Sequence, residues 1–217
     1  MKRRTLDLIV SAGGLVLAGL LLIAGLVLTS NANFARTYVH DQLAAQKISF
    51  KTADTLTAEE KQQACLVQYA GQPLTSGAQA ECYANNFINV HLQGIAGGKT
   101  YAELGTVTSG LQAQVTAAQK NNDPNLANLQ KQLADANASR DTVFKGETLR
   151  GLLLTSFGFS QFGEKAAQAA TVAYLASGLL LILALFGIIH AVRTPRTTAF
   201  AAPEIAERRS DRQTAGV

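Results

Sequence analysis

Two cysteines are the residues of this chain whose chemistry is easiest to predict. Cys65 and Cys82 are the only cysteines, and sixteen residues lie between them. This spacing differs from the C-x-x-C motif of thiol oxidoreductases and from the closely spaced cysteine pairs of zinc sites. We therefore expect a structural disulfide rather than a redox centre, and this part of the chain should then lie in an oxidising compartment.

No other set of side chains has the spacing of a catalytic or metal site. The histidines His40, His91 and His190 lie far apart and lack companions at ligand spacing. Ser160-Gln161 and the scattered glutamates do not form a nucleophile and its base. The string Gly97-Gly98-Lys99-Thr100 lacks the upstream glycine of a phosphate-binding loop, so we expect a connection between helices there. The sequence predicts a protein that is not an enzyme and that has no catalytic residues, metal or cofactor.

Two apolar runs define where the chain resides. Residues 8–28 and 170–189 contain no Asp, Glu, Lys, Arg or His. At about 1.5 Å per residue, a helix of either length spans the roughly 30 Å hydrocarbon layer of a membrane. We expect transmembrane helices over 8–28 and 166–192. A cleaved signal peptide is the alternative for the first run, because Ser30-Asn31-Ala32 offers a cleavage pattern, but the run is longer than the roughly 7–15 apolar residues of such signals.

The charges at the two ends predict the orientation in the membrane. Lys2, Arg3 and Arg4 precede the first run, and five arginines follow the second, whereas residues 29–165 hold 11 basic and 11 acidic side chains. Basic residues tend to remain cytoplasmic, so both termini (1–7 and 193–217) should be cytoplasmic and the middle extracytoplasmic. This is the topology of a multi-pass protein of the plasma membrane. The net charge of +4 favours contact with anionic membrane lipids, not with nucleic acid. The composition of the tail 193–217 predicts disorder.

The extracytoplasmic segment 29–143 should be helical throughout. Thr57 and Glu60 form a capping box at the start of a helix that should run to Gly71, and Ser76 should begin a second helix that ends at Gly94. An antiparallel hairpin of these helices brings the two cysteines together. Residues 100–120 and 124–136 carry apolar stripes joined by an Asn-Asn-Asp-Pro turn, which predicts a second hairpin. The predicted fold is thus an all-α membrane protein with two transmembrane helices flanking a helical extracytoplasmic domain.

Residues 144–165, directly before the second apolar run, have a composition of their own. They combine four leucines and four phenylalanines with four glycines, which predicts an amphipathic segment at the outer membrane surface. The alternative is that this segment only packs on the extracytoplasmic domain. Clustered aromatic side chains commonly anchor protein interfaces. The predicted partner-binding residues are Leu152, Leu153, Phe157, Phe159 and Phe162.

Small residues recur every seven positions in both apolar runs. Such seams let helix backbones approach closely in a membrane, so we expect the two helices to pack on each other or on another protein. Chance composition is the alternative, because small residues are common in membrane helices. The predicted packing residues are Ser11, Gly14, Ala18 and Gly25 in the first run and Ala170, Ser177 and Ala184 in the second.

The layout of the chain and the block from Phe144 to Leu154 resemble a group of actinobacterial two-span membrane proteins whose role is poorly defined. Small membrane proteins of this layout include accessory factors of the cytochrome bcc–cytochrome oxidase respiratory supercomplex. The resemblance thus implies an accessory or scaffolding subunit of a larger membrane assembly. The alternative is an extracytoplasmic ligand-binding sensor subunit that lacks its own output domain.

Overall fold

The computed structural model of the chain describes residues 3–195 and contains only helices as regular secondary structure over that range. This part of the fold prediction is confirmed. A single bridge between Ser49 and Pro73 is the one strand-like pairing among the described residues. Of the tail that we predict to be disordered, residues 196–217 lie outside the described range.

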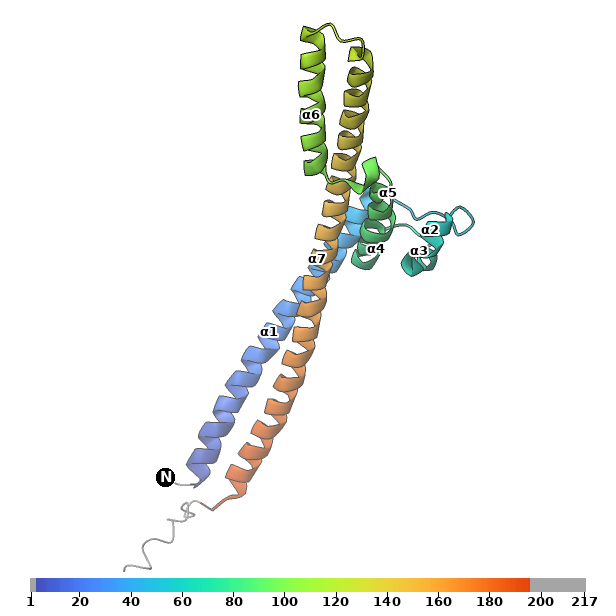
Figure 1. Cartoon of the computed structure of the whole chain (residues 1–217). Helices are drawn as coiled ribbons and strands as arrows, with labels where there is room; N and C mark the ends of the chain where they lie inside the picture. Colours follow the sequence, from blue (N-terminus) through green and yellow to red (C-terminus); the bar gives the residue numbers. More distant parts are fainter. Residues whose placement is uncertain (1–2, 196–217) are drawn as a thin grey trace, which may run out of the picture. The chain divides into compact units, whose positions relative to one another are not determined.

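Two long helices, α1 (Arg3–Ala45) and α7 (Leu126–Arg193), hold most of the described residues (Figure 1). Both are long and apolar enough to cross a membrane. The chain divides into two compact units, one with residues 1–31 and 166–217 and one with residues 32–165. We call the described part of the first the paired-span unit and the second the outer unit.

Short helices fill the outer unit between α1 and α6. They are α2 (Ala58–Lys61), α3 (Ala64–Gln68), α4 (Gly77–Cys82), a π-helical turn (Tyr83–Ile88) and α5 (Asn89–Gln93). A 3₁₀ turn (Ala96–Gly98) then leads into the longer helix α6 (Tyr101–Lys120). Capping boxes begin α2 at Thr57, α4 at Ser76 and α6 at Thr100, where each side chain accepts a backbone N–H bond. These three helix starts follow the sequence prediction. Gly97 and Gly98 adopt positive φ in the connection before α6.

The prediction of one continuous helix from Thr57 to Gly71 is wrong. It is divided into α2 and α3, because Gln63 has an extended backbone (φ −89°, ψ 99°). With this bend both Glu60 in α2 and Leu66 in α3 are buried, each about 1% exposed. Burial of these two side chains outweighs the regular hydrogen bonding that a single amphipathic helix would have gained.

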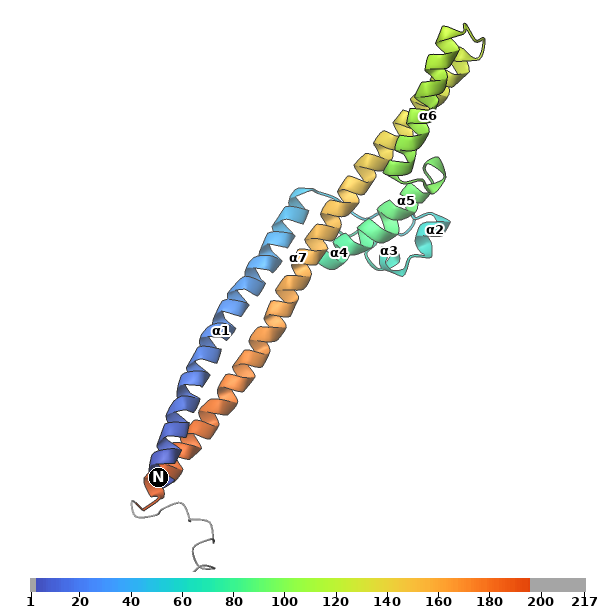
Figure 2. The same cartoon turned by 60° about the vertical axis from the view of Figure 1, so that its left-hand side comes forward.

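The second predicted hairpin is present as α6 and the first part of α7, which lie side by side in both views (Figures 1 and 2). Leu104, Val115 and Ala118 of α6 are buried. At the turn, the Asp123 carboxylate accepts a bond from the Asn125 N–H at 2.8 Å, and α7 begins at Leu126. The aspartate side chain thus closes the predicted turn, and the helix begins two residues after the predicted start at residue 124.

Residues 144–165 belong to α7, which continues through them without a break. Glycines within a helix disfavour it by about 1 kcal/mol each relative to alanine. For two of the glycines here, packing offsets this cost, because Gly146 lies against Leu92 and Gly163 lies against Ala35 of α1. The tertiary contacts thus preserve a helix where the local composition indicates interruptions.

Candidate interaction surface

The small-residue seam is buried within the paired-span unit. Ser11, Ala18, Gly25, Ala170, Ser177 and Ala184 are all buried, and Gly14 faces the methyl group of Ala184. The Ser177 hydroxyl donates a hydrogen bond to the Ala18 carbonyl at 2.8 Å. Gly25 accommodates the ring of Tyr174, whose hydroxyl lies 3.0 Å from the Thr29 hydroxyl. In this structure the seam residues contact the chain's own second helix, which leaves apolar faces of larger residues on the outside of the pair.

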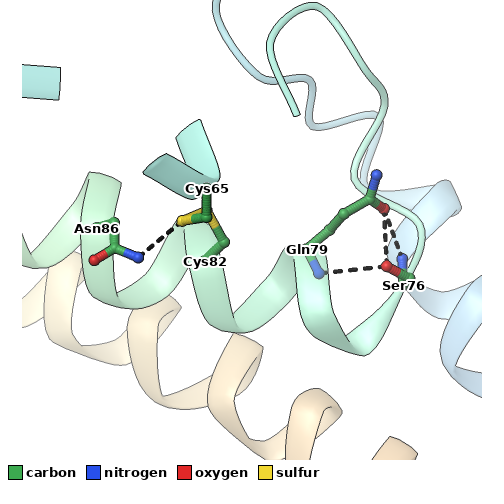
Figure 3. The surroundings of a disulfide bond; sticks show 5 residues. All are labelled: Cys65, Ser76, Gln79, Cys82 and Asn86. Carbon is green, nitrogen blue, oxygen red and sulfur yellow. Dashed lines mark hydrogen bonds between the residues drawn. A yellow bond between two sulfur atoms is a disulfide. The ribbon is translucent and has the colours of Figure 1, made fainter. Parts of the chain in front are cut away.

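The two cysteines form the predicted disulfide in the outer unit (Figure 3). Cys65 lies near the start of α3, and Cys82 is the last residue of α4. The Asn86 side-chain amide donates to the Cys65 sulfur at 2.8 Å, and the Ser76–Gln79 cap lies one turn away (Figure 3). This bridge joins α3 to α4 in the core of the outer unit, and the described residues contain no free cysteine.

The five predicted partner-binding residues fall on different faces of α7. Leu152, Phe159 and Phe162 are exposed, by 62%, 37% and 76%. Leu153 is buried in the core of the outer unit. Phe157 is half-buried, and its backbone lies against Gly77 of α4. The structure therefore brings three of the five to the surface and uses the other two for packing.

Aromatic side chains of α1 complete this surface. Phe34 and Tyr38 stack at 5.7 Å between ring centroids, and Phe159 meets both rings edge-on at 6.4 and 5.7 Å. Phe34 is 61% exposed and Tyr38 is 49% exposed. We call Phe34, Tyr38, Leu152, Phe159 and Phe162 the aromatic patch. Side chains of this size bury about 150–250 Å² each when covered, so the patch exposes roughly 430–710 Å² of apolar surface, at or above the upper end of what monomers show.

A groove of about 400 Å³ adjoins the aromatic patch between α1 and α7. Its walls are mainly apolar, with Leu43 and Leu153 at its base and Tyr38 and Phe159 at its edge. Gln42, Gln46 and Ser156 add neutral polar groups to the lining. No ionisable side chain other than the Tyr38 phenol lines the groove within the described part of the chain, so it suits apolar side chains or an uncharged apolar ligand rather than an ion or a phosphate.

A buried carboxylate lies elsewhere in the outer unit. Glu60 is about 1% exposed and accepts hydrogen bonds from the Lys51 ammonium at 2.8 Å and from the Thr57 backbone N–H at 2.8 Å. The His91 Nε2 atom lies 3.4 Å from the same carboxylate. Burial alone would raise the pKa of Glu60, but the Lys51 and Thr57 bonds and the neighbouring positive charge outweigh it, so the pKa lies below its ordinary value.

Aromatic rings lie next to the side chains that contact this carboxylate. Lys51 lies over the Phe87 ring, 5.3 Å from its centroid, and Phe87 packs on His91. Burial and the charge of Glu60 raise the pKa of the Tyr83 hydroxyl. The group has one carboxylate, one ammonium and one imidazole, and residues 3–195 contain no set of three or more His, Cys, Asp or Glu side chains that could hold a metal ion. The contacts of Glu60 fasten the α1–α2 connection to α2 and α5.

Sequence reasoning missed two parts of this arrangement. Phe34 and Tyr38 have a signal, because aromatic residues four positions apart on a helix share a face and both follow directly after the first apolar run. The group formed by Glu60, Lys51 and His91, which we call the Glu60 cluster, has no such signal in the sequence. In the sequence Glu60 is recognisable only as the last residue of a capping box, and its contacts with Lys51 and His91 arise only through the fold.

Comparisons with known proteins give no relative for this chain: no family model, curated protein or solved structure matches it.

Proposed function

We propose that this chain is a non-enzymatic membrane protein that acts as an accessory or scaffolding subunit of a larger membrane assembly. The aromatic patch is the observation that supports this most directly. It places four exposed aromatic rings and a leucine on two neighbouring helices, and aromatic residues are enriched among the side chains that dominate protein interfaces. The resemblance to accessory factors of the respiratory supercomplex makes a respiratory complex the first assembly to test.

The packing of the small-residue seam within the pair of long helices is consistent with the same proposal. The predicted seam residues are already in contact with each other, so the seam itself is not open to another helix. We propose that a partner is recognised chiefly by the outer unit. The lipid-facing Leu, Ile, Val and Phe side chains of the spans would contact membrane lipids, and no nucleic acid is involved.

Partner binding can be tested by native-detergent purification of the full chain followed by identification of proteins present in stoichiometric amounts. Changing Phe159 and Phe162 to alanine should reduce co-purification by at least about thirtyfold, since loss of one interface anchor costs about 2 kcal/mol or more. Phe157 is left unchanged, because it packs within the chain. Cytochromes among the retained proteins would identify a respiratory assembly.

The matched control replaces Asn121, Asn122 and Asn125 at the tip of the α6–α7 hairpin with alanine. These positions are exposed and polar, and we expect co-purification to stay within about twofold of the native protein. If the tip variant loses the partner and the phenylalanine variant keeps it, the aromatic patch is not the binding surface.

The proposed topology places both termini in the cytoplasm and the outer unit outside the plasma membrane. The disulfide supports this, because such bonds persist in oxidising compartments. The native background suits cysteine labelling, since both native cysteines are paired. Asn122→Cys should react with a membrane-impermeant maleimide in intact cells, and Thr198→Cys should react only after the membrane is opened. The opposite labelling pattern would reverse the topology.

The groove favours one alternative, a ligand-binding sensor subunit. Its volume of about 400 Å³ falls within the roughly 300–1,000 Å³ of small-molecule sites. A chain purified alone with a stoichiometric apolar molecule, released by organic extraction and detected by mass spectrometry, would favour this alternative over the accessory subunit.

A further inference from the structure

We infer that the aromatic patch receives one α-helix of a partner membrane protein, which lies along α7 and approaches its backbone most closely at Gly151 and Gly158. This inference rests on the proposed function and specifies how the partner binds. It concerns the face of α7 that carries Phe144, Thr148, Leu152, Thr155, Phe159 and Phe162, which we call the free face.

Three glycines of α7, Gly151, Gly158 and Gly178, have no packing explanation within the described part of the chain, and the first two lie in the outer unit. A Cβ atom added at Gly151 or Gly158 would meet nothing within 4 Å, whereas one at Gly146 would meet Leu92 and one at Gly163 would meet Ala35. Glycine is among the least favourable residues inside a helix. It is used where another group must approach the backbone closely. Gly151 and Gly158 therefore fit a contact that lies outside this chain.

The spacing on the free face indicates what makes that contact. Gly151 and Gly158 are seven residues apart, as are Leu152 and Phe159. Thr148, Thr155 and Phe162 repeat at the same interval, and every one of these larger side chains is exposed. A seven-residue repeat of large and small residues matches a helix that crosses at about +20° and inserts its side chains between those of α7.

The available area also fits a partner helix. With Phe144, which is 52% exposed, the free face and the α1 rings next to it expose roughly 510–840 Å² of apolar surface. A stable interface buries about 800 Å² on each partner, so a helix that covers this surface and its polar rim reaches the usual size. A lipid chain could cover the rings, but it would not require a close approach at two glycines in helical register.

The test introduces bulk at the glycines of the full-length protein in its native membrane. Gly151→Leu and Gly158→Leu should each leave the chain folded, because the space is open and leucine favours a helix. Each should lower co-purification of the partner by about tenfold or more, because the added side chain prevents close approach. The matched control is Gly110→Leu, an equally open glycine within α6, which should have no effect on the partner.

Site-specific photo-crosslinking gives the second measurement. A benzophenone side chain at Thr148 or Thr155 should form an adduct with the partner, one at exposed Glu164 should not, and the adduct should be lost in the Gly158→Leu chain. An adduct with a second copy of this chain, adducts with lipid alone, or equal crosslinking from all three positions would each overturn the inference. Retention of the partner by both glycine variants but not by the phenylalanine variant would reject the helical mode and leave the proposed function in place. A chain without any partner would reject the function itself.

Discussion

Replacing Lys51 with methionine should destabilise the α2–α5 region by about 2 kcal/mol, measured as the opening free energy from amide hydrogen exchange of the detergent-solubilised chain. The change removes the ammonium that donates to Glu60 and keeps an apolar stem beside Phe87. It leaves a carboxylate that is about 1% exposed with the Thr57 N–H and the His91 ring as its neighbours. Breaking one side of a fully buried ion pair costs about 3–5 kcal/mol, and the 35% exposure of the Lys51 side chain lowers the cost here.

Two comparisons separate this effect from a general loss of charge. The double variant Lys51→Met, Glu60→Gln should recover most of the lost stability, because no uncompensated buried charge remains. Lys145→Met removes a lysine whose ion pair with Asp141 is exposed on both sides, and it should change stability by less than about 1 kcal/mol. Equal effects of the Lys51 and Lys145 variants would show that the Glu60 cluster contributes nothing beyond an ordinary surface pair.

The same cluster predicts how stability depends on pH. The pKa of Glu60 is lower in the folded chain than the value of about 4.3 for a free glutamate. The unfolded chain therefore binds its proton first as the pH falls, and the stabilisation is fully present above about pH 5 and is lost as the pH falls through the folded pKa. In Glu60→Gln this part of the acid sensitivity of α5 exchange should disappear.

How far the sequence predicts this structure depends on how local each signal is. The capping boxes at Thr57, Ser76 and Thr100 are contained within four residues each, and all three begin helices as expected. The two apolar runs likewise lie within single helices. The separation of α2 from α3 could not be predicted, because it depends on burying Glu60 against a lysine and a histidine that lie in other segments.

The candidate surface divides in the same way. Clustered leucines and phenylalanines indicate a surface within residues 144–165. Composition alone does not show which face of the helix packs on the rest of the domain and which face stays exposed. Leu153 and Phe157 differ from Leu152 and Phe159 by one and two positions, and in this structure the first pair packs inward and the second faces outward. The contribution of α1 to the patch depends on pairing between segments more than a hundred residues apart.

Removing the disulfide should have the other large effect on stability. Changing Cys65 and Cys82 together to serine should lower the free energy of unfolding of the outer unit by about 3 kcal/mol, the value that loop closure predicts for cysteines 17 positions apart. The short helices α2 to α5 offer little regular hydrogen bonding of their own, so we expect the loss of exchange protection to concentrate there and to spare the α6–α7 hairpin.

Mass analysis of the native chain, alkylated before digestion without reduction, should show the two cysteine peptides linked. The serine variant should remain inserted in the membrane, because residues 8–28 and 170–189 are unchanged. Asn86→Ala provides a milder comparison, since it removes only the side-chain donor to the Cys65 sulfur and should cost no more than about 1 kcal/mol. Two free thiols in the native chain, or an unchanged exchange pattern in the serine variant, would remove the structural role of the bridge and favour a reactive-thiol role for these cysteines.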